Sequence, residues 1–491
     1  MTASSATETA TPRVASAIEV RSIDYVPEDE RHGKVWQQGP FWFLGNFQPF
    51  TLGIGLIGPG LGLSLTWTIV ASLLGIAFGT FFMAFHASQG PQLGLPQMIQ
   101  SRAQLGYQGV LLALAATAFT FIGFNVIDVV IIDQGLHNIF GWNPTAVGLA
   151  ITALAVVLAI YGHDWLHRAF RILFFLSLPL WALLTLGVFL GHAGGSTPAK
   201  AGFTLVAFMV QFTVAASYNI TYAPYVSDYS RYLPRDTKTS RIVAAVFFGA
   251  AGSPMWLIPL GAWMASRLGT TDALTGIHHA GNSFIGGLGS LLAVISVLAL
   301  VATMGLNAYS GMLTFITAFD SFRPITPTRR LRVITILALG VIWAVIGIGV
   351  IGDKNATTVL NNTLLIMLYL LVPWTAVNLV DYFFVRRKQY AITDMFRPDG
   401  GIYGRWAWRG LAAYVIGILA EIPFAVLGSF YTGPIAKDLL SGVDYSFAVG
   451  LVVAGGAYYL FSRSLDLSAE RTDVARSEAA LAGAGSEPVV V

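Results

Sequence analysis

The sequence contains no cysteine and very few charged residues. Without a thiol, the 491-residue chain cannot form a disulfide, a thiolate metal site or a cysteine nucleophile. Asp, Glu, Lys and Arg make up only 11% of the chain, against roughly 25% in ordinary soluble domains, which excludes a soluble globular protein. The formal net charge is only +3 and the basic residues sit in short loops, so nucleic acid is not an expected partner.

Long apolar runs take up most of the sequence instead. Apolar and aromatic residues make up 55% of the chain, and runs long enough to cross a bilayer recur from Phe41 to Phe461. The sequence therefore predicts an all-α polytopic membrane protein surrounded by the lipid bilayer. Twelve spans are expected, at about 41–62, 67–86, 108–132, 146–162, 170–191, 203–226, 242–266, 284–319, 333–352, 358–385, 410–431 and 445–462.

The distribution of lysine and arginine predicts the orientation of these spans. With both termini in the cytoplasm, all but four of the 28 basic residues lie in cytoplasmic segments, as the positive-inside rule requires. The four in outer loops are Lys200, Arg267, Lys354 and Lys437. We expect a multi-pass protein of the plasma (inner) membrane. Its expected cytoplasmic segments are an N-terminal tail at 1–39, a loop at 387–409 and a disordered tail at 463–491.

Two of the predicted spans are interrupted by proline and polar residues. The first is interrupted from Asn46 to Thr51 and the sixth from Asn219 to Tyr225. Helix breaks at corresponding positions of two halves indicate the midplane binding site of an inverted-repeat transporter. The predicted domains are a five-helix repeat at 40–192, a second at 203–386 and two accessory helices at 410–462. The alternative is that proline merely kinks these helices, as is common in membranes.

Asp128 in the third span is the strongest candidate for a functional residue. A charge inside the membrane is costly, so it indicates function by default. Phe124 lies four residues earlier and shares its helical face, and an aromatic ring beside a carboxylate suits a flat heterocycle with N–H donors. Burial would also favour a protonated carboxyl, which a proton-coupled carrier needs. The alternative is that Asp128 lies near the outer end of its helix and contacts water, as is expected of Asp133.

Polar residues in the sixth and eighth spans are further candidates. Asn219 and Tyr222 lie about one turn apart and could face a shared cavity. Thr303, Asn307 and Ser310 form a polar stripe on an otherwise apolar helix, although such stripes often only bond neighbouring helices. Enzyme motifs are absent from the sequence: it has no Walker loop, no His-Glu-x-x-His and no Gly-x-Ser-x-Gly. We therefore do not expect an enzyme.

Five segments together resemble a known family. They are Pro373–Arg387 (PWTAVNLVDYFFVRR), Asp399–Trp406, Gly94–Gln97 with Ser101 and Arg102, Ser227–Pro234, and Gly442–Ser446. On these residues the chain is similar to the purine and cytosine permeases of the nucleobase:cation symporter family 1, from about Ile23 to Ser462. The resemblance implies a five-plus-five inverted-repeat transporter fold, of the amino acid-polyamine-cation superfamily, with two C-terminal helices. It also implies cation-driven uptake of a nucleobase or a related heterocycle.

The resemblance also implies roles for single residues. Phe124 and Tyr222 match the two aromatic positions that sandwich the base, where the family usually has tryptophan. Asp128 takes the place of the family's amide, and this acid favours a cationic or donor-rich ligand, or a proton. The polar residue that the family has on its first helix falls near Thr51. The one on its eighth helix falls near Thr303 or Asn307. Sodium-coupled members use paired hydroxyls on the eighth helix. Here Val301, Ala302 and Thr303 supply a single hydroxyl, which favours protons over sodium.

The predicted function is import of a cytosine- or purine-like substrate by proton symport, with alternating access and no cofactor. Transport of another small heterocycle, such as a vitamin precursor, a hydantoin or allantoin, or of an amino acid stays open. A membrane receptor or an integral-membrane enzyme is the alternative outside transport. The predicted substrate site consists of Asn46, Gln48, Thr51, Phe124, Asp128, Asn219, Tyr222, Thr303 and Asn307, with Asp128 coupling the proton.

Overall fold

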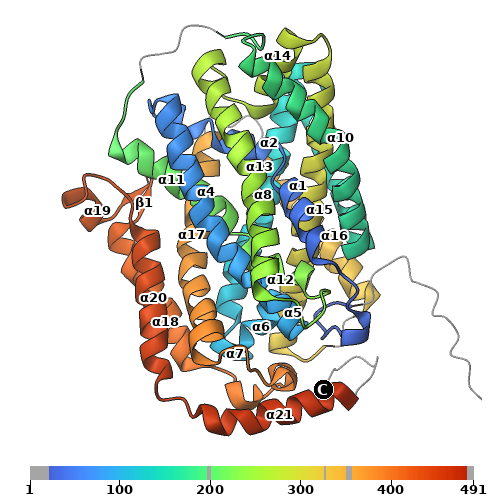
Figure 1. Ribbon diagram of the computed structural model, residues 1–491, viewed down its shortest axis with the longest axis vertical. Helices are drawn as coiled ribbons and strands as arrows, with labels where there is room; N and C mark the ends of the chain where they lie inside the picture. The colour runs from blue at the N-terminus through green and yellow to red at the C-terminus, as the bar shows by residue number, and fades with distance from the viewer. Residues whose placement is uncertain (1–20, 196–200, 326–327, 350–355, 429, 484–491) are drawn as a thin grey trace, which may run out of the picture.

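The described part of the protein is almost entirely helical (Figure 1). This computed structural model describes residues 21–195, 201–325, 328–349, 356–428 and 430–483. The first half contains α1 (Gln38–Gly45), α2 (Pro49–Ile54), α3 (Ile57–Gly60), α4 (Leu65–Ala87), α5 (Gln89–Leu93), α6 (Gln97–Gln100), α7 (Arg102–Leu105), α8 (Leu111–Phe140), α9 (Pro144–Tyr161) and α10 (His163–Phe189).

The second half begins, like the first, with an interrupted helix. It contains α11 (Leu205–Ile220), α12 (Ala223–Ser230), α13 (Thr239–Leu268), α14 (Ala273–Phe284), α15 (Leu288–Phe322), α16 (Arg329–Gly349) and α17 (Ala356–Val380), which runs into a π-helical turn, η3 (Asp381–Val385). The chain then forms α18 (Trp408–Glu421), β1 (Val426–Leu427), β2 (Tyr431–Thr432), α19 (Pro434–Asp438), α20 (Ser446–Ser462) and α21 (Leu467–Gly483). The two strands pair antiparallel, Val426 with Thr432.

Short 3-10 turns occupy several connections. They are η1 (Glu28–Glu30), η2 (Val35–Gln37), η4 (Ile392–Phe396), η5 (Gly401–Tyr403) and η6 (Ile422–Phe424). The helices pack as an upright bundle in Figure 1, with α14 across its upper end and α21 across its lower end. These are the α14 end and the α21 end of the bundle.

Nine of the twelve expected spans are confirmed as helices long and apolar enough to cross a membrane. They lie within the described ranges, from Leu65–Leu93 to Asn361–Val385. The expected first span is divided among α1, α2 and α3, because Gly45 to Pro49 interrupt the helix. The last two expected spans correspond to α18, of 14 residues, and α20, of 17. The count of twelve therefore stays a prediction.

The predicted disorder after 463 is wrong for most of that segment. Residues Leu467–Gly483 form α21, which meets α20 at a 93° bend. Composition alone predicted disorder because α21 has little apolar surface of its own. Ion pairs hold it to distant segments instead: Glu470 pairs with Arg386 at 3.0 Å, and Glu478 with Arg235 at 2.6 Å. Residues 1–20 and 484–491 of the expected tails lie outside the described residues, as do Lys200 and Lys354.

The N-terminal segment from residue 21 packs into the α21 end of the bundle. Ile23 and Val26 are buried, and the Val26 amide donates to the Gly94 carbonyl at 2.9 Å. Arg231 donates to the Ser22 carbonyl at 2.7 Å, and Arg31 to the Pro91 carbonyl at 2.7 Å. The segment expected as a tail therefore helps to close this end of the bundle.

Candidate substrate site

The two helix interruptions lie side by side in the middle of the bundle. The Asn46 side chain, after α1, donates to the Asn219 side chain, at the end of α11, at 2.7 Å. Both amide groups also donate to the Ala250 carbonyl of α13, at 2.8 and 2.9 Å, and Asn219 donates to Thr80 of α4 at 2.6 Å. Because all the amide donors are used within the protein, Asn46 and Asn219 tie the broken helices together.

Gln48 and Thr51 organise the start of α2 through Tyr218. The Gln48 side-chain oxygen accepts the Phe50 amide at 2.8 Å and caps α2, while its amide donates to the Tyr218 hydroxyl at 2.9 Å. Thr51 donates to the Asn46 carbonyl at 2.5 Å and lies 2.7 Å from the Tyr218 hydroxyl. Since Thr51 uses its hydrogen on Asn46, Tyr218 donates to Thr51. Through these hydrogen bonds, Tyr218 links α11 to the interrupted first helix.

Four aromatic rings, from α2, α8, α11 and the break between α11 and α12, meet beside this junction. Phe124 of α8 and Tyr222 lie nearly parallel, with ring centroids 5.7 Å apart and planes 21° apart. Phe50 stacks on Tyr218, with centroids at 5.3 Å and planes at 14°. Phe50 and Phe124 meet edge to face at 5.5 Å. A centroid distance of 5.7 Å is that of a direct aromatic pair. A flat ligand can enter between Phe124 and Tyr222 only if these rings move apart.

Asp128 lies one turn beyond Phe124 and is enclosed. Only 2% of its surface is exposed, so the alternative in which Asp128 contacts water does not hold in this conformation. No residue in the described ranges donates a hydrogen bond to its carboxyl group, which is unusual for a buried polar group. A carboxyl with free bonding capacity therefore lies next to the aromatic pair.

Asp133 does not contact water as expected. It is completely buried, because the start of α9 covers this part of α8. Its carboxyl lies against the backbone at Gly148, where an added Cβ would come within 2.8 Å of the Asp133 oxygen.

The polar stripe of α15 binds neighbouring helices. Asn307 donates to the side chain of Asn125 at 2.9 Å, and the Tyr225 hydroxyl donates to Asn307 at 3.4 Å. Asn125 in turn donates to the Met304 carbonyl at 3.1 Å. Thr303 donates to the Ala299 carbonyl of its own helix at 3.2 Å and lies 3.4 Å from the Gly45 carbonyl. The stripe connects α15 to α8, α12 and the end of α1.

Two residues that were not predicted from the sequence, Asn125 and Tyr218, lie among the predicted site residues. Asn125 was overlooked beside Phe124, although an amide inside a predicted span is itself a signal. Tyr218 directly precedes Asn219 and lies one turn from Tyr222, so the same periodicity argument could have found it. All nine predicted site residues are at most 2% exposed. The region is therefore closed to solvent at both ends in this conformation.

Comparisons with known proteins agree with this architecture. The family described as "Permease for cytosine/purines, uracil, thiamine, allantoin" matches residues 25–450. The chain belongs to this permease family. YxlA of Bacillus subtilis (strain 168), which is provisionally named a purine-cytosine permease, is 34% identical to it over 446 residues. These residues are 91% of this chain and 96% of YxlA. Purine-cytosine permease fcyB of Emericella nidulans is 23% identical over 462 residues, covering 90% and 87% of the two chains.

The permease also shares its fold with solved transporters. Mhp1, a nucleobase-cation-symport-1 family transporter in a closed conformation with bromovinylhydantoin bound, matches it with a TM-score of 0.69. The sequences are 19% identical, and the match covers 94% of this chain and all of Mhp1. The expected family and fold class are therefore confirmed. The protein is a membrane transporter and not an enzyme.

Proposed function

We propose that this permease imports a nucleobase-like heterocycle, cytosine or a purine, by proton symport. The observation that supports this substrate class is the parallel pair of Phe124 and Tyr222 beside the enclosed Asp128 carboxyl. If the pair opens, a flat ring fits between the two aromatic faces, where base stacking contributes about 1–3 kcal/mol per base. Asp128 can then accept a hydrogen bond from a ring N–H or an amino group of the substrate.

Asp128 is also the proposed carrier of the proton. Proton symport requires a group near the substrate that binds and releases a proton during each cycle. Asp128 is a titratable group with free bonding capacity, whereas Asn46 and Asn219 do not titrate and use their amide donors within the protein. Thr303 is the single hydroxyl among Val301, Ala302 and Thr303, which gives a sodium ion fewer oxygen ligands there. These features favour a proton as the coupling ion.

Transport further requires that the enclosed site opens to one side at a time. We propose alternating access, with the two interrupted helices as the moving parts. Opening to the α21 end would displace the N-terminal segment, since Arg231 binds the Ser22 carbonyl there. We assign the α21 end to the cytoplasmic side of the plasma (inner) membrane. Basic residues gather there, including Arg102, Arg386 and Arg409, as the positive-inside rule predicts.

Uptake into proteoliposomes tests the proposed function. Radiolabelled cytosine, adenine, hypoxanthine, uracil and a hydantoin would be offered with an imposed proton gradient and, separately, with a sodium gradient. We expect accumulation of cytosine or a purine that depends on the proton gradient and disappears with an uncoupler. Protein-free liposomes are the control. If only the hydantoin accumulated, the substrate would be a hydantoin and not a nucleobase. If accumulation required a sodium gradient and not a proton gradient, the proposed coupling ion would be wrong.

A further inference from the structure

A two-part groove opens at the edge of the α21 end, between η3, α20 and α21. Its polar part is a cavity of about 480 Å³ that is lined by four arginines, Arg386, Arg387, Arg463 and Arg471, and by Glu470. Its apolar part is a neighbouring hollow of about 490 Å³. That hollow is lined by Val380, Phe383, Phe384, Arg387, Gly456 and Tyr459. The two parts share Phe384, Arg387 and Tyr459, so they form one continuous groove.

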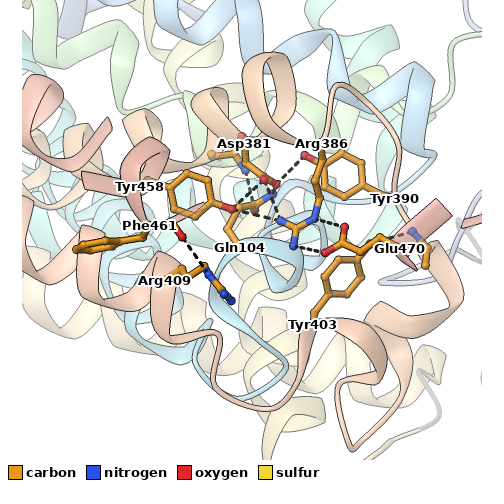
Figure 2. Close-up of polar contacts among 11 residues, drawn as sticks. Gln104, Asp381, Arg386, Tyr390, Tyr403, Arg409, Tyr458, Phe461 and Glu470 are labelled. Carbon is orange, nitrogen blue, oxygen red and sulfur yellow. Dashed lines mark hydrogen bonds and ion pairs between the residues drawn. The ribbon is translucent and has the colours of Figure 1, made fainter. Parts of the chain in front are cut away.

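One of the four arginines is neutralised inside the protein. Arg386 is buried and forms ion pairs with Asp381 at 2.8 Å and Glu470 at 3.0 Å (Figure 2). Tyr390 and Gln104 also donate to the Asp381 carboxyl, at 2.8 and 2.6 Å. This network anchors α21 to η3, and its charges are satisfied without any ligand.

The other three arginines are exposed, and none of them has a carboxylate partner in the described part of the chain. Arg463 lies over the Tyr459 ring, 5.4 Å from its centroid. Arg387 has a φ of 49°, a backbone conformation that is unfavourable for a residue other than glycine. Three arginines without a carboxylate partner therefore line the polar part of the groove, where Glu470 offsets part of their charge, and Arg387 also borders the apolar hollow.

The groove lies at the level where membrane and water meet. Trp406 and Trp408 are 61% and 56% exposed, and exposed tryptophans mark the interface of membrane proteins. Arg409, over the Trp408 ring, donates to the Phe461 carbonyl at the end of α20 (Figure 2). On the same helix the apolar Val452 is 70% exposed, which suits a position against the lipid tails. The arginines thus lie at headgroup level, and the hollow extends toward the hydrocarbon.

We propose that this groove binds an anionic phospholipid of the leaflet at the α21 end. The lipid phosphate pairs with Arg387, Arg463 and Arg471, because guanidinium groups bind phosphate oxygens in bidentate fashion. An acyl chain lies in the hollow against Phe384 and Gly456. Basic pockets between helices at a membrane surface are suited to anionic headgroups. The bound lipid would bridge α20, η3 and α21, and so fix α21 to the bundle.

Binding can be measured on the purified protein in neutral detergent, without any transport assay. Phosphatidylglycerol, phosphatidylcholine with the same acyl chains, and inorganic phosphate would be titrated separately. Thermal unfolding and native mass spectrometry would follow each titration. We expect phosphatidylglycerol alone to raise the unfolding temperature, because a ligand that binds the folded state stabilises it. An equal shift with phosphatidylcholine would overturn the role of charge, and an equal shift with inorganic phosphate would overturn a lipid as the ligand.

Two sets of variants locate the site. The triple variant Arg387→Gln, Arg463→Gln, Arg471→Gln should bind phosphatidylglycerol on the order of 100-fold more weakly, since each basic residue contributes about a factor of five near an anionic lipid. The control removes three exposed arginines elsewhere, Arg241, Arg323 and Arg330, and should bind normally. Equal loss in both variants, or no loss in the first, would overturn the assignment.

A further substitution tests the apolar part with every charge intact. An added Cβ at Gly456 meets no atom within 4 Å, so Gly456→Phe should fold and fill the hollow. It should weaken phosphatidylglycerol binding at least tenfold. Val452→Phe places the same side chain on the same helix outside the groove and should leave binding unchanged. Unchanged binding by Gly456→Phe would show that no acyl chain occupies the hollow.

Discussion

At the residue scale, Phe124 and Tyr222 define the proposed stacking position. Phe124→Ala should weaken substrate binding by about 1–3 kcal/mol, because one of the two faces that cover the base is lost. The measurement is equilibrium binding of labelled substrate to the purified protein. Phe248→Ala is the control, since Phe248 is 73% exposed on the outer surface of α13. An unchanged affinity in Phe124→Ala would show that this ring only packs against its neighbours.

Asp128 is the second position that decides function at this scale. Asp128→Asn keeps the size of the side chain and one acceptor oxygen but removes the titrating group. We expect it to abolish accumulation driven by a proton gradient while substrate exchange continues across proteoliposomes. Glu421→Gln serves as the control, because Glu421 is an equally buried carboxyl on α18, outside the site. Concentrative uptake by Asp128→Asn at the normal rate would exclude Asp128 as the proton carrier.

At the scale of elements, close backbone contacts hold the interrupted first helix against α13. A Cβ added at Gly55, just after α2, would lie 2.2 Å from the Ile258 carbonyl of α13, whereas one added at Gly53 meets nothing within 4 Å. Gly55→Ala should therefore lower the free energy of unfolding by about 1–3 kcal/mol through overpacking. Gly53→Ala should leave it unchanged or raise it. Thermal unfolding in detergent measures both, and equal effects would contradict this packing argument.

At the scale of the whole molecule, the absence of cysteine allows a direct test of orientation. Lys437 in α19 and Arg330 in α16 are both exposed, and the charge distribution places them on opposite sides of the membrane. A membrane-impermeant thiol reagent should label Lys437→Cys on intact cells. It should label Arg330→Cys only after permeabilisation. The cysteine-free parent is the control. Labelling in the reverse order would show that the orientation is inverted.

The sequence by itself determined nine of the helices that are long and apolar enough to cross a membrane, and where the helices break. Nine spans, the interruption before Pro49 and the interruption near Pro224 follow from local composition, because apolar length and proline act on a helix irrespective of its neighbours. The family resemblance rests on the same local patterns. It correctly predicted a transporter fold without any knowledge of contacts between helices.

Only the tertiary structure decided which side chains meet. Helical periodicity predicts the face of the helix on which Asn307 lies. It does not predict that Asn307 donates a hydrogen bond to Asn125 of α8. Tyr218 reaches Gln48 and Thr51 across about 170 residues of chain. The helix α21 exists although its composition predicts disorder, since Arg386 and Arg235 reach it from far along the chain. Such contacts depend on how helices rotate and pack in three dimensions. The pattern of apolar residues along the sequence does not specify that arrangement.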